Sequence, residues 1–371
     1  MENEGRAFDL LMMQGALALA RRGLGSVWPN PAVGCVIAKE GRAVARGSTG
    51  KGGRPHAETE ALARAGEEAR GATLYASLEP CCHWGLTPPC TKAIIAAGVR
   101  RVVVALEDPD PRVKGKGIER LSEAGLLVEE GLCRDEAAEV NAGFLSRTLR
   151  GRPFVTLKLA TSLDGRIATA KGESRWITGP LARERGHLLR ATHDAILVGT
   201  GTVLADDPLL DCRLRGLESR SPVRLALDRR LKIPLGARIF AGAPERPTWL
   251  LSSPAADQRK REALCAAGVD VIVIERESAE GIDLEAALAA LAARGLTRLL
   301  VEGGARLASS LIRAGLVDRL LWFHAPMVIG GEGIGAIAGL KIEALGKAPV
   351  FETVSSERLG EDVLTSFRAR G

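Results

Sequence analysis

The sequence predicts an α/β protein built from two domains. Short, β-branched apolar runs alternate with helical segments along the chain, and this alternation stops once and then restarts. The interruption is a charged stretch with Gly and Pro from Arg147 to Pro153. We therefore expect domains at residues 1–149 and 150–371, and 371 residues are enough for two hydrophobic cores.

The first domain reads as helices alternating with strands. Asp9 and Gln14 interrupt the first apolar run, which is typical of an amphipathic helix and not of a signal peptide. Gly and Pro mark most of the other boundaries. The expected elements are a helix at 8–23, a hairpin at 30–47 around Glu40-Gly41, a helix between Pro55 and Gly66, a strand at 72–80, a helix at 87–99 and a strand at 100–109.

The second domain repeats this alternation. Its apolar runs are short and bounded by turn residues, so each indicates a strand. The run at 283–295 is rich in alanine and predicts a helix. The expected strands are 154–160, 194–199, 222–228, 248–252, 269–274, 298–304 and 319–326.

Composition restricts the class of partner. The formal charge of +6 and a pI near 9.1 suit an anionic ligand, but basic and acidic residues are interleaved, which favours phosphorylated small molecules. One Tyr, seven Phe and five Trp leave few rings for stacking nucleic-acid bases. Seven cysteines, an odd number, indicate reduced thiols and a cytoplasmic location. No segment is apolar for long enough to span a membrane.

Three cysteines and a histidine lie close together in LEPCCHWGLTPPC, residues 78–90. A zinc ion that activates water needs three protein ligands, an open fourth position and a carboxylate that moves the proton. His56 and Glu58 in HAE supply one ligand and the carboxylate, provided that His56 lies at a helix start, where Pro55 places it. Cys81 and Cys90 follow prolines, and a helix start lowers the pKa of a thiol, so these two are the expected thiolate ligands.

The spacing of the two cysteines leaves alternatives open. The usual zinc-deaminase signature has P-C-x-x-C, whereas Cys90 lies nine positions after Cys81 (90 − 81 = 9). Cys82 and His83 therefore remain rival ligands, although adjacent side chains of an extended backbone point in opposite directions. A closed structural zinc site is a second alternative. The remaining cysteines, Cys35, Cys133, Cys212 and Cys265, are expected to be small buried apolar residues.

The second domain has no G-x-G-x-x-G fingerprint, so an ordinary Rossmann dinucleotide site is not predicted. In VEGGARLASSLI a buried strand ends at Glu302, where ligands of α/β proteins collect. Gly303-Gly304 then begin a helix whose free N–H groups would suit a phosphate. A strand-to-helix turn without any ligand is the alternative.

Four motifs of the first domain, HAE, EPCCHWGLTPPC, PNPAVGCVI and ALEDPDPRVKGKG, resemble the bacterial bifunctional riboflavin-biosynthesis proteins, in which a pyrimidine deaminase is fused to a reductase. The resemblance extends over nearly the whole chain. It implies a cytidine-deaminase-like zinc domain followed by a dihydrofolate-reductase-like domain. It further implies zinc on His56, Cys81 and Cys90, with Glu58 as the catalytic proton carrier and Asn30 as a partner of the pyrimidine ring. Two positions depart from the family pattern: Asp110 replaces the usual Asn, and Cys82 replaces a small polar residue.

The second domain carries its own family motifs, LKLATSLDGRIA, SRWITG, LLRATHDAILVGTGTVLADDPLL and VEGGARLASSLI. The resemblance implies NADPH as cofactor, and a guanidinium fork suits a sugar phosphate. Lys158 and Asp164 would position the ribose or ring, or serve the fold. The residues implied to face the cofactor are Ala160, Trp176, Thr202, Asp206, Gly304, Ala305, Arg306, Leu307, Ala308, Ser309 and Ser310. Those implied to face the substrate are Ser174, Arg190, Leu210, Arg213 and Glu302.

The resemblance implies two successive steps of riboflavin biosynthesis. The first is hydrolytic deamination of 2,5-diamino-6-ribosylamino-4(3H)-pyrimidinone 5′-phosphate, and the second is NADPH-dependent reduction of the ribosyl group of the product to ribityl. We expect a homo-oligomer acting on a small phosphorylated pyrimidine, without nucleic acid or membrane. The rivals are a nucleic-acid base deaminase with a C-terminal binding domain, which salt-sensitive affinity for RNA or DNA would reveal, and a chain in which only the deaminase is active.

Overall fold

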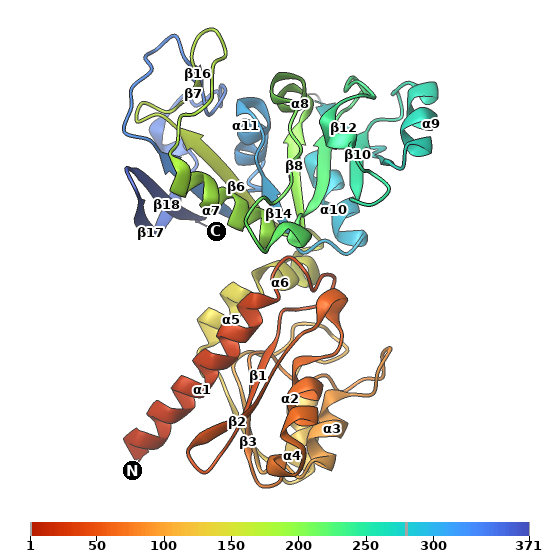
Figure 1. The fold of residues 1–371 in the computed structure, drawn as a ribbon, viewed down its shortest axis with the longest axis vertical. Coiled ribbons are helices and arrows are strands. Elements are labelled where there is room, and N and C mark those ends of the chain that lie inside the picture. The colour runs from red at the N-terminus through yellow and green to blue at the C-terminus, as the bar shows by residue number, and fades with distance from the viewer. Residues whose placement is uncertain (1, 279–280, 371) are drawn as a thin grey trace. The chain divides into compact units, whose positions relative to one another are not determined.

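The computed structural model describes residues 2–278 and 281–370, with the side chains of residues 2–4 left aside. The chain divides into two compact units, Met1–Gly151 and Arg152–Gly371, and each is described by itself (Figure 1). Among the described residues, no helix has both the length and the hydrophobicity that crossing a lipid bilayer requires.

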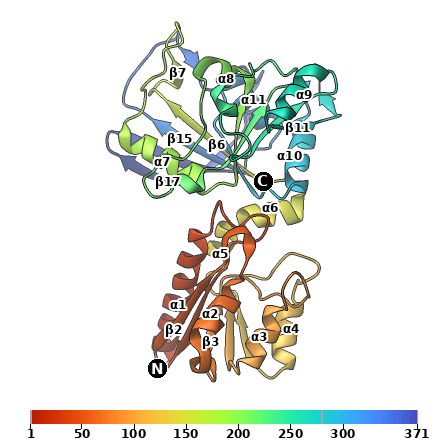
Figure 2. The ribbon, with the colours of Figure 1, turned by 45° about the vertical axis from the view of Figure 1, so that its right-hand side comes forward.

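The first unit is a five-stranded sheet with helices on both faces. Its strands lie in the order β2-β1-β3-β4-β5; β1 runs antiparallel to β2 and β3, and β3, β4 and β5 are parallel. Helices α2, α3 and α4 lie on one face, and α1 and α5 on the other (Figures 1 and 2). The elements are α1(Glu2–Arg22), β1(Gly34–Lys39), β2(Arg42–Ser48), α2(Ala57–Ala65), β3(Thr73–Ala76), α3(Cys90–Ala96), β4(Arg101–Val104), α4(Lys116–Glu123), β5(Leu127–Glu130), α5(Arg134–Val140) and α6(Ala142–Arg150).

All six elements expected in this domain are confirmed, including the turn at Glu40 and Gly41, which both have positive φ. The elements after residue 109 were not predicted. Strand β5 was not predicted because three of its four residues are exposed, so no apolar run marks it in the sequence.

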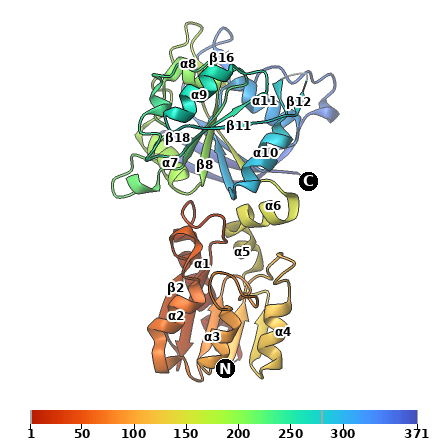
Figure 3. The same ribbon diagram turned by 90° about the vertical axis from the view of Figure 1, so that its right-hand side faces the viewer.

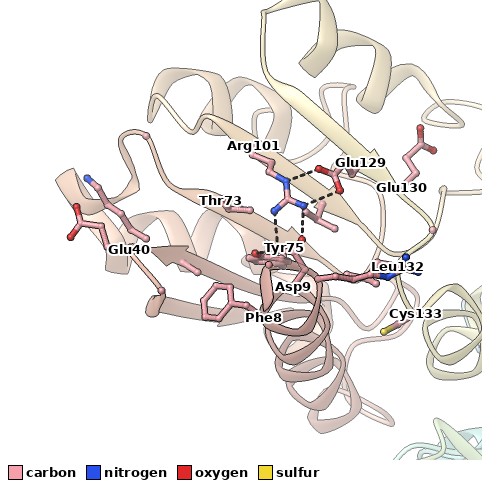
Figure 4. A pocket seen from close by; sticks show the side chains of 18 residues that line it. Phe8, Asp9, Glu40, Thr73, Tyr75, Arg101, Glu129, Glu130, Leu132 and Cys133 are labelled. Atoms are coloured by element: carbon pink, nitrogen blue, oxygen red, sulfur yellow. Dashed lines mark hydrogen bonds and ion pairs between the residues drawn. The ribbon is translucent and has the colours of Figure 1, made fainter. Parts of the chain in front are cut away.

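A partly exposed ion-pair network joins α1 to the sheet. Arg101 on β4 donates to both carboxylate oxygens of Asp9 on α1, at 2.8 and 2.6 Å, and to Glu129 on β5 at 2.7 and 2.8 Å. The hydroxyl of Tyr75 also donates to Asp9 (Figure 4). These residues line a cavity of about 1210 Å³, and none of the predicted site residues contributes to it. Arg6 and Lys39 also line this cavity, and within it the carboxylates of Asp9 and Glu129 match Arg101.

The second unit contains a nine-stranded mixed sheet with the strand order β11-β10-β9-β8-β14-β6-β15-β18-β17. The strands from β11 to β15 are parallel, and β18 and β17 continue the sheet antiparallel. Figure 3 shows helices flanking this sheet. The elements are β6(Phe154–Thr161), β7(Arg166–Ala168), α7(Pro180–Ala191), β8(Ala195–Gly199), α8(Thr200–Asp206), β9(Val223–Leu227), β10(Thr248–Ser252), α9(Gln258–Ala266), β11(Asp270–Val273), β12(Glu277–Ser278), β13(Gly281–Ile282), α10(Leu284–Ala293), β14(Arg298–Val301), α11(Ala305–Arg313), β15(Arg319–His324), β16(Ile334–Gly335), β17(Phe351–Leu359) and β18(Asp362–Ala369).

The seven strands expected in this domain are confirmed, as is the alanine-rich helix α10. Parallel strands β8 and β14 are buried along their length, which explains their continuous apolar runs. The β17–β18 hairpin was not predicted. Seven of the nine residues of β17 are exposed, so the strand shows neither a long apolar run nor clear alternation.

Candidate active sites

The three predicted zinc ligands lie together in the first unit. The ligand atoms of His56, Cys81 and Cys90 all lie within 4.8 Å of one another. His56 Nδ1 is 3.2 Å from Cys90 Sγ and 3.6 Å from Cys81 Sγ. A tetrahedral zinc with usual bond lengths separates a nitrogen and a sulfur ligand by roughly 3.5 Å. The cluster therefore fits a zinc ion in both donor type and spacing.

Local structure directs each of these side chains. His56 is the residue immediately before α2 and has an extended backbone, so the helix does not fix its direction. Cys90 is the first residue of α3. The expectation of a helix start at Cys81 is wrong, since Cys81 lies in the loop after β3. Its sulfur instead accepts a hydrogen bond from the Cys90 amide at 3.3 Å. Cys81 therefore lies against the N-terminal end of α3 without being part of that helix.

The pKa values of the two thiols shift in opposite directions because the thiols hydrogen-bond to each other. Hydrogen bonds from Cys90 outweigh burial and, with His56, lower the pKa of Cys81 to about 4. The pKa of Cys90 rises for the complementary reason, its hydrogen bond to Cys81, and burial adds to this rise. Without a cation, only one of the two is ionised. A divalent ion would remove this conflict, because thiolate ligands bind it deprotonated.

Glu58 lies one residue inside α2 and is only 3% exposed. Burial raises the pKa of its carboxyl to about 7. It lines the same cavity of about 400 Å³ as His56 and Cys81. A buried carboxyl poised near neutrality beside a metal-ligand cluster is the arrangement that proton transfer requires.

The rival ligands lie outside the cluster. Cys82 Sγ faces the carbonyl oxygen of Arg112 at 3.7 Å. His83 lines the cavity, and its buried Nδ1 has no hydrogen-bond partner among the described residues. Among the remaining cysteines, Cys35 and Cys212 are buried as expected. The expectation is wrong for Cys265, which is exposed, and Cys133 is only half-buried.

The loop that closes this cavity depends on Glu79, whose role sequence analysis missed. Its buried carboxylate accepts amide hydrogen bonds from Asp108, Gly115, Gly117 and Ile118, at 2.8 to 3.3 Å. A carboxylate directly before Pro80 and Cys81, at the end of an apolar strand, was the available signal. Glu79 thus ties the metal-ligand loop to residues 108–118.

Asp110, the departure from the family pattern, has a partner of its own. Its carboxylate binds the guanidinium of Arg112, with Nη2 at 2.5 Å and Nε at 3.0 Å, and also accepts the Arg112 amide. These contacts lower the pKa of Asp110. Asp110, Arg112 and Asn30 all line the cavity, while burial raises the pKa of neighbouring Asp108 to about 7.

In the second unit, six of the predicted residues line one cavity of about 480 Å³. At its centre, Arg190 donates to Glu302 through Nε and Nη2, both at 2.9 Å, and through Nη1 to the Asp211 carbonyl. Half-buried Lys158 also lines the cavity, and burial lowers its pKa. Arg213 is more exposed and binds Asp211 Oδ1 at 2.8 Å. The predicted residues in this cavity are Ala160, Ser174, Trp176, Arg190, Arg213 and Glu302.

A second cavity of this unit, of about 870 Å³, lies where β8 and β9 end, beside α11. Gly199, Gly201, Arg306, Leu307 and Ser310 are among its lining residues. The amide of Gly304 is not free, contrary to the sequence-based expectation, because it donates to Thr202 Oγ1 at 3.0 Å. The helix nevertheless begins as expected, with Gly304 directly before the first residue of α11.

Several predicted residues line neither cavity. Leu210 lies in a hydrophobic cluster and is only 3% exposed. Ser309 is buried and donates to the carbonyls of Ala305 and Ala338, so its hydroxyl serves the helix. The members of this group are Thr202, Asp206, Leu210, Gly304, Ala305, Ala308 and Ser309.

Comparison with known proteins gives one consistent result. Residues 7–106 match the model of the cytidine and deoxycytidylate deaminase zinc-binding region, and residues 153–365 match the RibD C-terminal domain. Riboflavin biosynthesis protein RibD of Aquifex aeolicus is 42% identical over 98% of this chain and 99% of its own. The chain belongs to the RibD family. The Escherichia coli relative of the same name is 41% identical over 96% of this chain and 98% of its own.

Solved structures of RibD proteins agree. Acinetobacter baumannii RibD has a TM-score of 0.89 and 39% identity, covering 99% of this chain and 100% of its own. A Thermotoga maritima protein has a TM-score of 0.87 and 34% identity with the same coverage. It is described as a diaminohydroxyphosphoribosylaminopyrimidine deaminase and 5-amino-6-(5-phosphoribosylamino)uracil reductase.

Family membership confirms the fold class and the enzyme class expected from the sequence. The chain is a bifunctional enzyme of riboflavin biosynthesis, with a zinc-binding deaminase region and a pyrimidine reductase domain. It acts on small pyrimidine molecules, and its reductase domain implies a nicotinamide cofactor.

Proposed function

We propose that the first unit hydrolyses the exocyclic amine of 2,5-diamino-6-ribosylamino-4(3H)-pyrimidinone 5′-phosphate. The second unit then reduces the ribosyl group of 5-amino-6-(5-phosphoribosylamino)uracil to ribityl with NADPH. The observation that carries the first assignment is the His56, Cys81 and Cys90 cluster beside buried Glu58. The names of the relatives and the two separate cavities support the pair of reactions.

In the first unit, His56, Cys81 and Cys90 would hold the zinc ion, which when bound acidifies water. Glu58 accepts a proton from this water, and the oxygen then forms a bond to the ring carbon that carries the amine. Glu58 returns the proton to the amine, so that the C–N bond breaks and ammonia leaves. Asn30, on the cavity wall, contacts the pyrimidine ring.

In the second unit, NADPH when bound would supply a hydride to the ribosyl carbon C1′; the C1′–O4′ bond would break and O4′ would take a proton from water, so that the ribosyl ring opens to ribityl. Glu302, Arg190, Ser174 and Arg213 contact the substrate, while Trp176 and Ala160 border the cofactor. Arg190 uses three of its five N–H groups within the protein, so it orients Glu302 and leaves the phosphate mainly to Arg213.

The choice of NADPH over NADH rests on the larger cavity of the second unit. Arg306 lines it and forms no ion pair with any acidic side chain in the described part of the chain. A guanidinium at this place suits the additional phosphate of NADPH. Amides of the first turn of α11, at Ala305 and Arg306, would support another phosphate.

The proposed domain limits are residues 1–149 for the deaminase and 150–371 for the reductase. The cysteines in the described residues are all free thiols, which supports a cytoplasmic location. Strand β17, with an open edge and mostly exposed residues, supports assembly into a homo-oligomer.

The decisive experiment separates the two activities. Glu58→Gln keeps the size of the side chain but cannot accept the proton, so deamination should fall by about 10²- to 10⁴-fold while zinc is retained. Reduction of separately supplied deaminated substrate should stay near the parent rate. Ammonia release and NADPH absorbance report the two reactions. If Glu58→Gln also stops reduction, the division of labour between the units is wrong.

A further inference from the structure

Arg54 holds an unusual position on the wall of the first unit's cavity. Two arginines line this cavity, and Arg112 is matched by Asp110. Arg54 instead contacts the hydroxyl of Thr87 at 2.5 Å and His56 Nε2 at 2.9 Å, and no carboxylate in the described part of the chain pairs with it. Arg54 is therefore the unmatched guanidinium of a cavity that must receive an anionic substrate.

The other charges of the cavity do not attract an anion. Glu58, Glu79, Asp108 and Asp110 all line it. Backbone amides match Glu79, and Arg112 matches Asp110, so these groups leave no net positive charge. A substrate with a phosphate gains a favourable contact here only where a free cation lies.

The ring of His56 gives a second, independent argument. Its Nδ1 faces the two sulfurs, so the ring proton lies on Nε2 when Nδ1 binds a metal. That N–H and the Arg54 guanidinium are then two donors facing each other across 2.9 Å. The His56 N–H thus lacks the acceptor that a metal-ligating histidine normally finds, and Arg54 donates only to the neutral hydroxyl of Thr87. An oxyanion placed beside them would accept from both.

The contact with Thr87 places the Arg54 guanidinium at the mouth of the cavity. It belongs to the loop at residues 82–88, where Leu86 is 90% exposed and Trp84 is 69% exposed. The hydroxyl of Thr87 accepts from Arg54 and retains its own proton for a further acceptor. In a pyrimidine ribosyl phosphate the phosphate is remote from the ring, so a mouth position suits it when the ring lies against Glu58.

We propose that Arg54, with His56 Nε2–H and Thr87, binds the 5′-phosphate of the deaminase substrate and selects phosphorylated over unphosphorylated pyrimidine ribosides. This inference rests on the deaminase function proposed above and adds a specificity-determining residue to it.

The test uses the full-length protein carrying Glu58→Gln, loaded with cobalt(II), whose visible spectrum reports only on the metal site. It is titrated with the pyrimidine ribosyl 5′-phosphate and with the same compound after phosphatase treatment. Adding Arg54→Ala should weaken binding of the phosphorylated compound by about 10- to 100-fold. Binding of the unphosphorylated compound should change by less than about 3-fold, and Arg54→Lys should restore part of the loss.

Two control variants separate this role from a structural one. Arg112→Ala removes the matched arginine and should not reproduce the selective loss. Thr87→Val removes one neutral hydroxyl from the proposed phosphate site, together with its contact to Arg54, but keeps the cation, so it should weaken binding of the phosphorylated compound much less than Arg54→Ala does. An equal loss for both ligands, no loss, or a Thr87→Val variant as weak as Arg54→Ala would overturn the proposal. If the Glu58→Gln protein that keeps Arg54 shows no spectral response to either ligand, the proposed deaminase site is wrong. The proposed phosphate-binding role of Arg54 is then wrong as well.

Discussion

Arg190 and Glu302 form a two-point ion pair in the cavity of the second unit, with both N–O distances at 2.9 Å. Their side chains are 15% and 14% exposed. Burial alone would raise the pKa of Glu302, but the charges of Arg190 and Lys158 outweigh it and hold this pKa at about 2. Glu302 therefore remains a carboxylate at neutral pH. In this state it can only accept hydrogen bonds and cannot serve as a proton donor.

Glu302→Gln should slow reduction and destabilise the second unit at pH 7. Removing the charge leaves half-buried Arg190 and Lys158 without a counter-ion, which costs about 1–3 kcal/mol. The folded pKa of Glu302 lies below its unfolded value, so its stabilisation is present above the unfolded pKa near 4.5 and is lost as pH falls toward 2. Urea unfolding of the parent and the variant should therefore converge between pH 5 and 2.

Glu361→Gln is the matched control, because Glu361 is exposed in the turn between β17 and β18. It should leave reduction and stability unchanged within about 0.5 kcal/mol. Equal reduction rates for Glu302→Gln and the parent would contradict the binding role of Glu302.

Metal content should distinguish the three neighbouring cysteines. Cys81→Ser and Cys90→Ser each remove a sulfur from the cluster, so both should lose zinc after dialysis. Cys82→Ser should keep one zinc per chain, because the Cys82 sulfur faces the Arg112 carbonyl. Elemental analysis of purified protein measures this, and zinc loss from Cys82→Ser would show that the ligand set is wrong.

Glu79→Gln should weaken the deaminase unit without touching the reaction directly. The amide side chain of Gln offers one acceptor oxygen in place of two, so some of the four backbone amides lose their partner. We expect a loss of about 1–3 kcal/mol in the unfolding free energy. Faster hydrogen exchange at residues 108–118 should accompany it. Glu119→Gln, at an exposed position of α4, should change neither property.

Elements and site residues that have a signal in the local sequence could be predicted. Buried parallel strands such as β8 and β14 appear as continuous apolar runs because both of their faces are covered. The cluster of His56, Cys81 and Cys90 also came from local signals, since each directly follows a proline and two of them, His56 and Cys90, lie at helix starts. The exposed strand β17 gave no such signal, because solvent on both sides removes the need for apolar residues.

Relationships between distant segments could not be read from the sequence. Glu79 acts through amides 29 to 39 positions away, and backbone amides leave no mark in a sequence. The pairing of Arg190 with Glu302 spans 112 positions. Leu210 was expected at the substrate and is buried among apolar side chains instead, which only its packing reveals.

The start of α11 provides the last prediction. A Cβ added at Gly304 would lie 3.4 Å from Thr202 Oγ1, which is ordinary van der Waals distance, so Gly304→Ala should fold normally. Gly304→Asp adds a carboxylate at the same place, next to the amides of Ala305 and Arg306 that we propose for a cofactor phosphate. Repulsion between the two anions should weaken NADPH binding by at least about 10-fold, as a lost charged contact does.

Fluorescence titration with NADPH measures this for the parent, Gly304→Ala and Gly304→Asp. Gly304→Ala should bind NADPH within about 3-fold of the parent, because it adds a methyl group without a charge. This variant therefore measures the effect of side-chain bulk alone. Deamination should be unaffected in both variants, since Gly304 belongs to the second unit. If Gly304→Asp binds NADPH as tightly as Gly304→Ala while its circular dichroism is unchanged, no cofactor phosphate lies at this helix start. The arginines of the larger cavity would then have to bind the cofactor without the amides at the start of α11.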